Sequence, residues 1–220
     1  MGQTKHGQSA LGLVALLMAG LLALPSTGLA QLGGLLPPPP TSTTTTTVTG
    51  DATAVRATLF GALGLLTTTT ALADTGTLSG VNDARDASMD TGTVPSVLTG
   101  EVLSAGTISW PDEVDSAVSL ANLNMTVAGV GITADSVVAQ ASQVLGAAGS
   151  GTSYIDNLSI NGMPVAVTGA PNQTVWVPGG QVIINEQTIS STGTAVVNAL
   201  HVAITGVADV VIASATAGIS

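Results

Sequence analysis

Two copies of the tripeptide Asp-Thr-Gly, beginning at Asp74 and Asp90, are the most suggestive chemical motif in the chain. Aspartic proteases use this tripeptide because two such carboxylates at close range share one proton. Here the two aspartates are sixteen positions apart, too few for a lobe around each, and the second copy follows a polar segment. A dimeric enzyme would need only one copy. A secreted aspartic protease is therefore one alternative, although Asp-Thr-Gly is also a good turn sequence.

The other titratable residues offer little further chemistry. His201 is the only imidazole after residue 30, no G-x-S-x-G motif accompanies it, and the apolar residues on both sides of it predict a packed or edge position. Zinc has almost no ligand set, because the chain lacks cysteine. Asp83, Asp86 and Asp90 could gather a calcium ion, but their spacing matches no EF-hand loop, and a solvated acidic loop is the favoured interpretation. We predict a protein that is not an enzyme, with no catalytic, cofactor-binding or metal-binding residue and no cofactor.

Residues 173–187, QTVWVPGGQVIINEQ, contain Trp176 and Glu186 in a chain poor in aromatic and charged residues. Pro178 and Gly179 supply the turn geometry of a β-hairpin, and the apolar residues around them predict cover on both sides. We expect Glu186 to be structural and to accept hydrogen bonds from turn amides or an amide side chain. Trp176 is expected to cover an open face of the sheet and to find a partner for its indole N–H.

Composition limits the possible partners. The net charge is −10, only 7% of the residues are charged, and 45% are hydrophobic. A chain without a basic patch cannot neutralise phosphates, so nucleic acid and anionic membrane surfaces are unsuitable partners. With so little charge, the surface is weakly protected against self-association.

The N-terminus has the layout of a secretory signal peptide. An apolar run over residues 10–24 is followed by Pro25 and the tripeptide Gly28-Leu29-Ala30, which predicts cleavage after Ala30. A retained membrane anchor is the alternative. We expect a signal peptide over residues 1–30, a Pro/Thr-rich leader or N-terminal strand over residues 31–50, and one β-rich extracellular domain over residues 51–220, with no stable membrane insertion after cleavage.

Short runs rich in Val, Ile and Thr, separated by turn residues, predict an all-β domain with a single β-sandwich or barrel-like fold. The dipeptide Asn161-Gly162 predicts a tight hairpin turn. Residues 136–145 also fit a helical period, so their type stays open. Residues 81–95 are polar and are predicted to form an exposed loop. The strands are expected at residues 52–59, 65–73, 101–110, 116–127, 131–143, 152–160, 164–168, 195–205 and 209–216, besides the hairpin.

The C-terminal half resembles the choice-of-anchor P family of bacterial secreted and surface proteins, over roughly residues 98–218. The resemblance rests on the run before Asn161-Gly162, the Pro171-Asn172 turn, the strand end at residues 185–187, the segment NALHV at residues 198–202 and the final Val- and Ala-rich strand. It implies a β-rich extracellular domain of no established activity. The chain has no LPxTG-like signal, no C-terminal hydrophobic span and no basic tail, so we expect a protein that is released or held outside the cell by its own copies.

We therefore predict an extracellular, self-assembling structural protein, such as a filament, pilus-like or surface-layer subunit. A monomeric adhesion or carbohydrate-binding module is the alternative. The segment from Thr41 to Thr49 (TSTTTTTVT) is β-branched, uncharged and preceded by polyproline, so it is predicted to be a donor strand that pairs with another copy. Pairing within its own domain is the other possibility.

Overall fold

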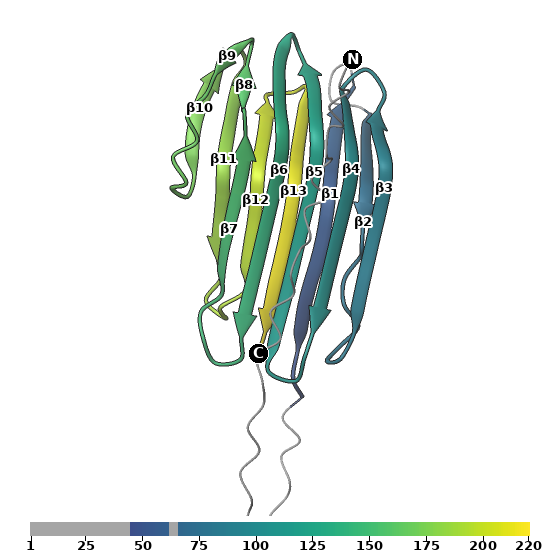
Figure 1. Ribbon diagram of the computed structural model, residues 1–220, viewed down its shortest axis with the longest axis vertical. Helices are drawn as coiled ribbons and strands as arrows, with labels where there is room; N and C mark the ends of the chain where they lie inside the picture. The colour runs from purple at the N-terminus through teal and green to yellow at the C-terminus, as the bar shows by residue number, and fades with distance from the viewer. Residues whose placement is uncertain (1–44, 62–65) are drawn as a thin grey trace, which may run out of the picture. The chain divides into compact units, whose positions relative to one another are not determined.

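The computed structural model describes residues 45–61 and 66–220, and every regular element in them is a β-strand. The strands form two antiparallel sheets that pack face to face (Figure 1). The prediction of an all-β sandwich is confirmed. The predicted signal peptide and most of the predicted leader lie outside the described residues. No helix in the described ranges has the length and apolar character needed to cross a membrane.

We call the six-stranded sheet, with strand order β10-β11-β12-β13-β1-β2, sheet A. Sheet B has the order β3-β4-β5-β6-β8-β9, and β7 pairs with β6 beside that path. The strands of sheet A are β1 (Val48–Phe60), β2 (Thr67–Asp74), β10 (Gln173–Val177), β11 (Gly180–Ile189), β12 (Ala195–Ile204) and β13 (Ala208–Ile219). The strands of sheet B are β3 (Ala84–Val94), β4 (Leu98–Ser109), β5 (Glu113–Val127), β6 (Val130–Val144), β7 (Ser150–Asp156), β8 (Ser159–Ile160) and β9 (Met163–Pro164).

The first and last strands lie side by side. Val48 of β1 is paired with Ile219 of β13, and Thr47 exchanges two backbone hydrogen bonds with Ser220, at 2.7 and 3.0 Å. Residues 47–49 are therefore paired within their own domain, which begins a few residues before the predicted boundary at residue 51. Residues 41–44 of the predicted donor strand lie outside the described part of the chain.

Several predicted elements differ from the structure. The polar segment 81–95 is largely the edge strand β3, because an edge strand can expose both its faces and tolerates polar residues. Residues 136–144 belong to β6, so the helical alternative is wrong. The predicted strand 152–160 is divided between β7 and β8, and only Met163–Pro164 of the region around 164–168 is a strand. The turn at Asn161-Gly162 is confirmed, with φ of 52° and 74° at its two residues.

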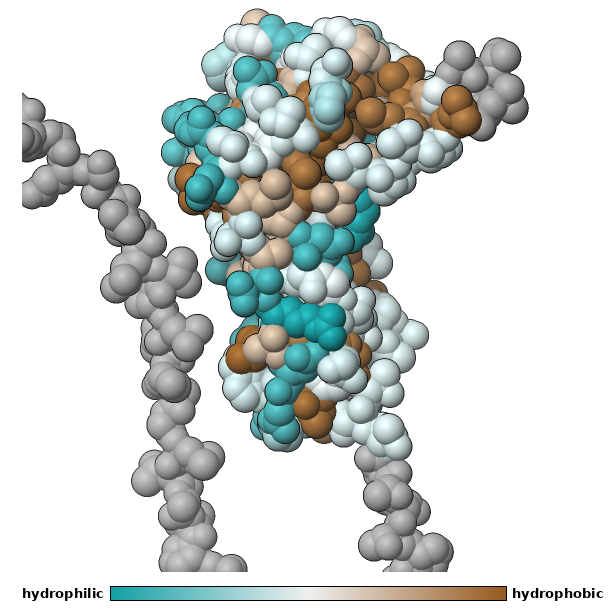
Figure 2. All heavy atoms as spheres, turned by 90° about the vertical axis from the view of Figure 1, so that its right-hand side faces the viewer, coloured by the Kyte–Doolittle hydropathy of each residue, from teal (hydrophilic) through white to brown (hydrophobic). Residues whose placement is uncertain are grey.

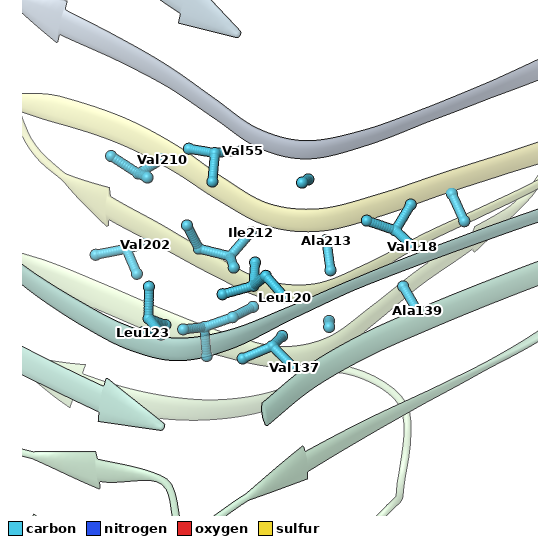
Figure 3. Close-up of a cluster of buried hydrophobic side chains, with 14 of the residues drawn as sticks. Val55, Val118, Leu120, Leu123, Val137, Ala139, Val202, Val210, Ile212 and Ala213 are labelled. Atoms are coloured by element: carbon cyan, nitrogen blue, oxygen red, sulfur yellow. The ribbon is translucent and has the colours of Figure 1, made fainter. Parts of the chain in front are cut away.

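The core is a layer of Val, Ala, Leu and Ile side chains between the sheets. β13 packs against β5 and β6, and Figure 3 shows Ile212 and Val210 facing Leu120 and Leu123. Without cysteine, and with very few aromatic residues, this layer supplies the packing that stabilises the fold. Because many of its members are as small as alanine, the two sheets can approach closely.

Both sheets bend across their middle. In sheet A two consecutive residues point into the core at the same level of several strands, as at Ala54–Val55 of β1 and Ala199–Leu200 of β12. In sheet B two consecutive residues instead point outward, as at Glu101–Val102 and Asp135–Ser136. At each of these positions the alternation of inward and outward side chains is broken, and the backbone pairing skips one residue. On alternate strands of sheet A the same position holds a residue of positive φ: Ala73 (45°), Ala213 (53°) and Asn185 (53°).

The two sheets bend in the same direction. The extra residues of sheet A point into the core, toward sheet B, and the extra residues of sheet B point away from the core, so both sets point to the same side of the sandwich. The ribbons in Figure 3 curve together at this level. We call the interrupted positions the bend line. Along it, residues that strict alternation would separate come to lie on one face, and this arrangement builds the polar cluster described next.

Candidate functional site

The chain's one described histidine lies in a polar cluster on the outer face of sheet A. Nδ1 of His201 lies 3.0 Å from Oε2 of Glu186, and Nε2 lies 3.2 Å from Oδ2 of Asp209. Asn198 donates a hydrogen bond of 2.6 Å from Nδ2 to Oε2 of Glu186. We call these four residues the His201 cluster. It joins three neighbouring strands, β11, β12 and β13.

The bend line assembles this cluster. Ala199 and Leu200 both point into the core, so Asn198 and His201 both point outward although they are three residues apart. Glu186 is paired directly with Asn198 in the ladder between β11 and β12, and from there its carboxylate reaches both side chains. In a regular strand, residues three apart would point to opposite faces.

The electrostatics of the cluster favour the imidazolium form. Burial alone would lower the pKa of His201, but the hydrogen bond and charge of Glu186, followed by those of Asp209, outweigh it and raise the pKa above its ordinary value of 6.5. The side chain of His201 is 19% exposed. A protonated ring between two carboxylates donates from both nitrogens, so it has no free nitrogen with which to accept a proton from a substrate. This geometry suits a structural ion pair, and Asn198 is the amide partner that was expected for Glu186.

The two Asp-Thr-Gly copies lie in different local structures. Asp74 is at the end of β2, where its Oδ1 accepts hydrogen bonds from Thr53 Oγ1 at 3.2 Å and from the amide of Gly76 at 3.0 Å. Asp90 is an exposed residue in the middle of β3, at the bend line of the other sheet. The first copy therefore closes a turn and the second runs through a strand.

The three predicted loop acids are also separated. Asp83 accepts hydrogen bonds from the amide of Ser79 at 2.7 Å, its hydroxyl at 2.8 Å and Nε of Arg85 at 3.2 Å. Backbone and hydroxyl donation by Ser79 lowers the pKa of Asp83 to about 2. Asp86 and Asp90 are four residues apart on one strand, or about 13 Å at the usual rise per residue. Within residues 45–61 and 66–220, no group of three or more acidic or histidine side chains is arranged to hold a metal ion.

The hairpin of β10 and β11 is confirmed, but its predicted cover is wrong. Val175 and Val177 pack against the core, while Trp176 points outward and is 78% exposed. The expectation that Trp176 covers an open face fails because β10 is the edge strand of sheet A and no described element packs over the outer face there.

A feature that the sequence analysis did not identify is the other edge of sheet A. Among the described strands, β2 is hydrogen-bonded to β1 alone, and residues 67–73 carry no charge. Figure 2 faces the side of the sandwich on which β2 and β3 lie, and shows hydrophobic residues exposed at its upper end. The run of four threonines was a strand signal, but its edge position depends on long-range pairing of β1 with β13.

In comparisons with known proteins, no family model, no curated protein and no solved structure matches this chain. The resemblance to the choice-of-anchor P family stays a prediction from the quoted residues.

Proposed function

We propose that the protein is a non-catalytic structural subunit that acts outside the cell and assembles with copies of itself into a filament or surface layer. The observation that carries this proposal is β2, an eight-residue edge strand with open backbone groups and no charge before Asp74. Open strand edges add strands from other chains, and charged residues are a usual protection against this.

The use of the titratable groups supports a structural rather than a catalytic role. Among the described residues, His201 is bonded on both nitrogens, Asp74 closes a turn, and Asp83 caps the segment before β3. Each of these groups stabilises its own domain. We infer that the acids and the imidazole contribute to stability and not to turnover.

We assign the self-association to the folded domain. Residues 47–49 pair with β13 of their own chain, so a donor strand could use at most residues 41–46. The apolar run at residues 10–24 and the tripeptide ending at Ala30 support secretion. We expect the secreted protein to begin at Gln31, which N-terminal sequencing would check.

Electron microscopy and light scattering of the full secreted chain over a range of concentrations test the proposal. We expect elongated or layered particles whose mass increases with concentration. Compact monomers at every concentration would refute self-assembly. An acid-pH casein assay on the same preparation tests the non-catalytic assignment, because cleavage that Asp74→Asn or Asp90→Asn abolishes would identify a protease.

A second candidate, a carbohydrate- or surface-binding module, is favoured by the 78% exposure of Trp176. Aromatic rings stack on sugar faces, and an exposed tryptophan on an edge strand is accessible to such a ligand. Glycan binding by a monomeric protein, lost in Trp176→Ala but kept in Val175→Ala, would support this function instead.

A further inference from the structure

The backbone groups of β2 that face away from β1 follow from its register. The amide of Gly61 donates to the carbonyl of Leu66 at 2.6 Å, which makes these two residues a hydrogen-bonded pair. In an antiparallel ladder bonded and non-bonded pairs alternate, so Thr68, Thr70 and Leu72 bond to β1. The N–H and C=O groups of Thr67, Thr69 and Ala71 therefore point to the open side.

The strand facing β2 agrees with this assignment. Phe60 is paired with Thr67, and its amide donates a hydrogen bond of 2.9 Å to the carbonyl of Val207. This bond lies on the side of β1 away from β2. Six backbone groups thus form an unpaired row on β2. Among the described residues no hydrogen bond reaches this row.

We propose that β2 pairs antiparallel with β2 of a second copy, about a twofold axis at Thr69, so that two copies of sheet A form one continuous sheet. This inference rests on the proposed self-assembly and specifies one of its contacts, since a twofold contact alone joins two copies. With Thr69 opposite Thr69 and Thr67 opposite Ala71, every open group finds a partner and six hydrogen bonds form. A shift of the register by two residues would leave only four, because the outward groups lie on alternate residues.

The same register gives two apolar side chains, Leu66 and Leu72, a partner in the other copy. Leu66 continues the alternation of Thr68, Thr70 and Leu72, so it lies on their face of the strand. It is 75% exposed, and Leu72 is half-buried. In the paired sheet Leu66 of one copy is directly opposite Leu72 of the other, at both ends of the junction. Such cross-strand apolar pairs are a main source of sheet stability.

The other long or exposed edges are protected. β3 carries Asp86 and Asp90, and pairing two such strands would bring like charges together in a chain of net charge −10. On β7, the carbonyl of Gly151 already accepts a hydrogen bond of 3.1 Å from Nε2 of Gln187. β2 and β7 both carry a charge only at their last residue, and β2 is the longer of the two, with no hydrogen bond from a described residue on its open side.

β10, the opposite edge of sheet A, is a poorer partner. It has five residues, and Pro178 follows its last residue directly. The side chain of Gln173, its first residue, accepts from the amide of Thr168 at 2.9 Å and donates to the carbonyl of Ala166 at 2.8 Å, so a neighbouring segment lies beside this edge. β2 pairing with itself satisfies more backbone groups than β2 pairing with β10.

Charge substitutions at the axis test the pairing. In Thr69→Lys, and separately in Thr69→Glu, two like charges would face each other across the junction, and we expect the Kd for dimerisation in the full chain to increase at least tenfold. A mixture of the two variants should recover the affinity, because opposite charges then meet. Thr174→Lys on β10 is the matched control, since it makes the same charge change at an exposed threonine of the opposite edge. Analytical ultracentrifugation measures each Kd.

A cross-link gives a second measurement. The chain has no cysteine, so Thr69→Cys introduces a single thiol, and two residues paired across a bonded position lie about 5.5 Å apart, within disulfide range. We expect a covalent dimer under mild oxidation in Thr69→Cys and little in Thr174→Cys. Equal cross-linking in the two variants would overturn the assigned register.

The outcomes separate this inference from the proposed function. Assemblies of the wild-type chain that both charge variants leave unchanged would overturn the β2 contact and leave the structural role intact. A wild-type chain that stops at dimers sensitive to Thr69 would support the contact and refute the filament. A wild-type chain that stays monomeric would refute both.

Discussion

Glu186 and His201 meet across the ladder of β11 and β12, where both carboxylate oxygens lie within 3.1 Å of Nδ1. Asp209 lies at the other nitrogen of the same ring. The three residues thus connect three adjacent strands on the outer face of sheet A, over which no other described strand packs. Because the bend line places Asn198 on the same side, one carboxylate serves two partners.

Glu186→Ala should lower the free energy of unfolding by about 2 to 3 kcal/mol, because it leaves Asn198 and His201 without their common partner and hydrogen bonds to charged groups are the stronger ones. Thermal unfolding monitored by circular dichroism at pH 6 measures this effect. Glu186→Gln is the matched control, and it should cost less because its amide oxygen still accepts from Asn198. An unchanged melting curve for Glu186→Ala would contradict the structural role.

The stability contributed by His201 should depend on pH. Its pKa is higher in the folded state than the ordinary value of 6.5, so the contribution is fully present below that value and is lost as the pH rises through the folded-state pKa. The difference in unfolding free energy between wild type and His201→Gln should be about 1 to 2 kcal/mol at pH 5.5 and should shrink by pH 9. Urea unfolding at the two pH values measures it. A difference that grows with pH would show that the neutral ring is the stabilising form.

The local patterns of the sequence predicted much of the fold. Pro178-Gly179 and Asn161-Gly162 have mechanisms that act within four residues, so both hairpins were predictable. The strands of 15 residues were underestimated because polar residues on an exposed face interrupt an apolar run without ending the strand. The strand β3 was missed because edge strands lack the apolar alternation by which buried strands are recognised.

The His201 cluster could not be predicted, because it depends on the bend line. Asn198 and His201 would point to opposite faces in a regular strand, and only the phase change at Ala199 and Leu200 brings them together. That change is set by the neighbouring strands, which share it. The sequence offered a weaker indication that Asp209 lies near His201. The glycine at residue 206 indicates a turn, which folds β13 back beside His201.

Asp83 should contribute acid-sensitive stability. Its pKa is lowered to about 2 by the hydrogen bonds of Ser79, so its contribution is present above the ordinary value of 3.8 and is lost as the pH falls through about 2. We expect Asp83→Asn to have a lower Tm than wild type at pH 5 and a Tm closer to it at pH 2. Asp86→Asn, on the neighbouring exposed edge, should show no such convergence. A constant difference between Asp83→Asn and wild type at the two pH values would contradict this assignment.

Val102 should be a site at which an exposed substitution stabilises the protein. It has a φ of 49° and is 67% exposed, and a β-branched residue in the left-handed region is strained by about 1 kcal/mol or more. Asn122 and Asn157 occupy bend positions of sheet B at φ of 50° and 51°, and asparagine tolerates this conformation. Val102→Asn should therefore raise the free energy of unfolding by about 1 kcal/mol, measured by urea unfolding. Val144→Asn, an exposed change without positive φ, is the control and should give no gain. Equal effects of the two substitutions would show that the backbone at the bend line is not strained.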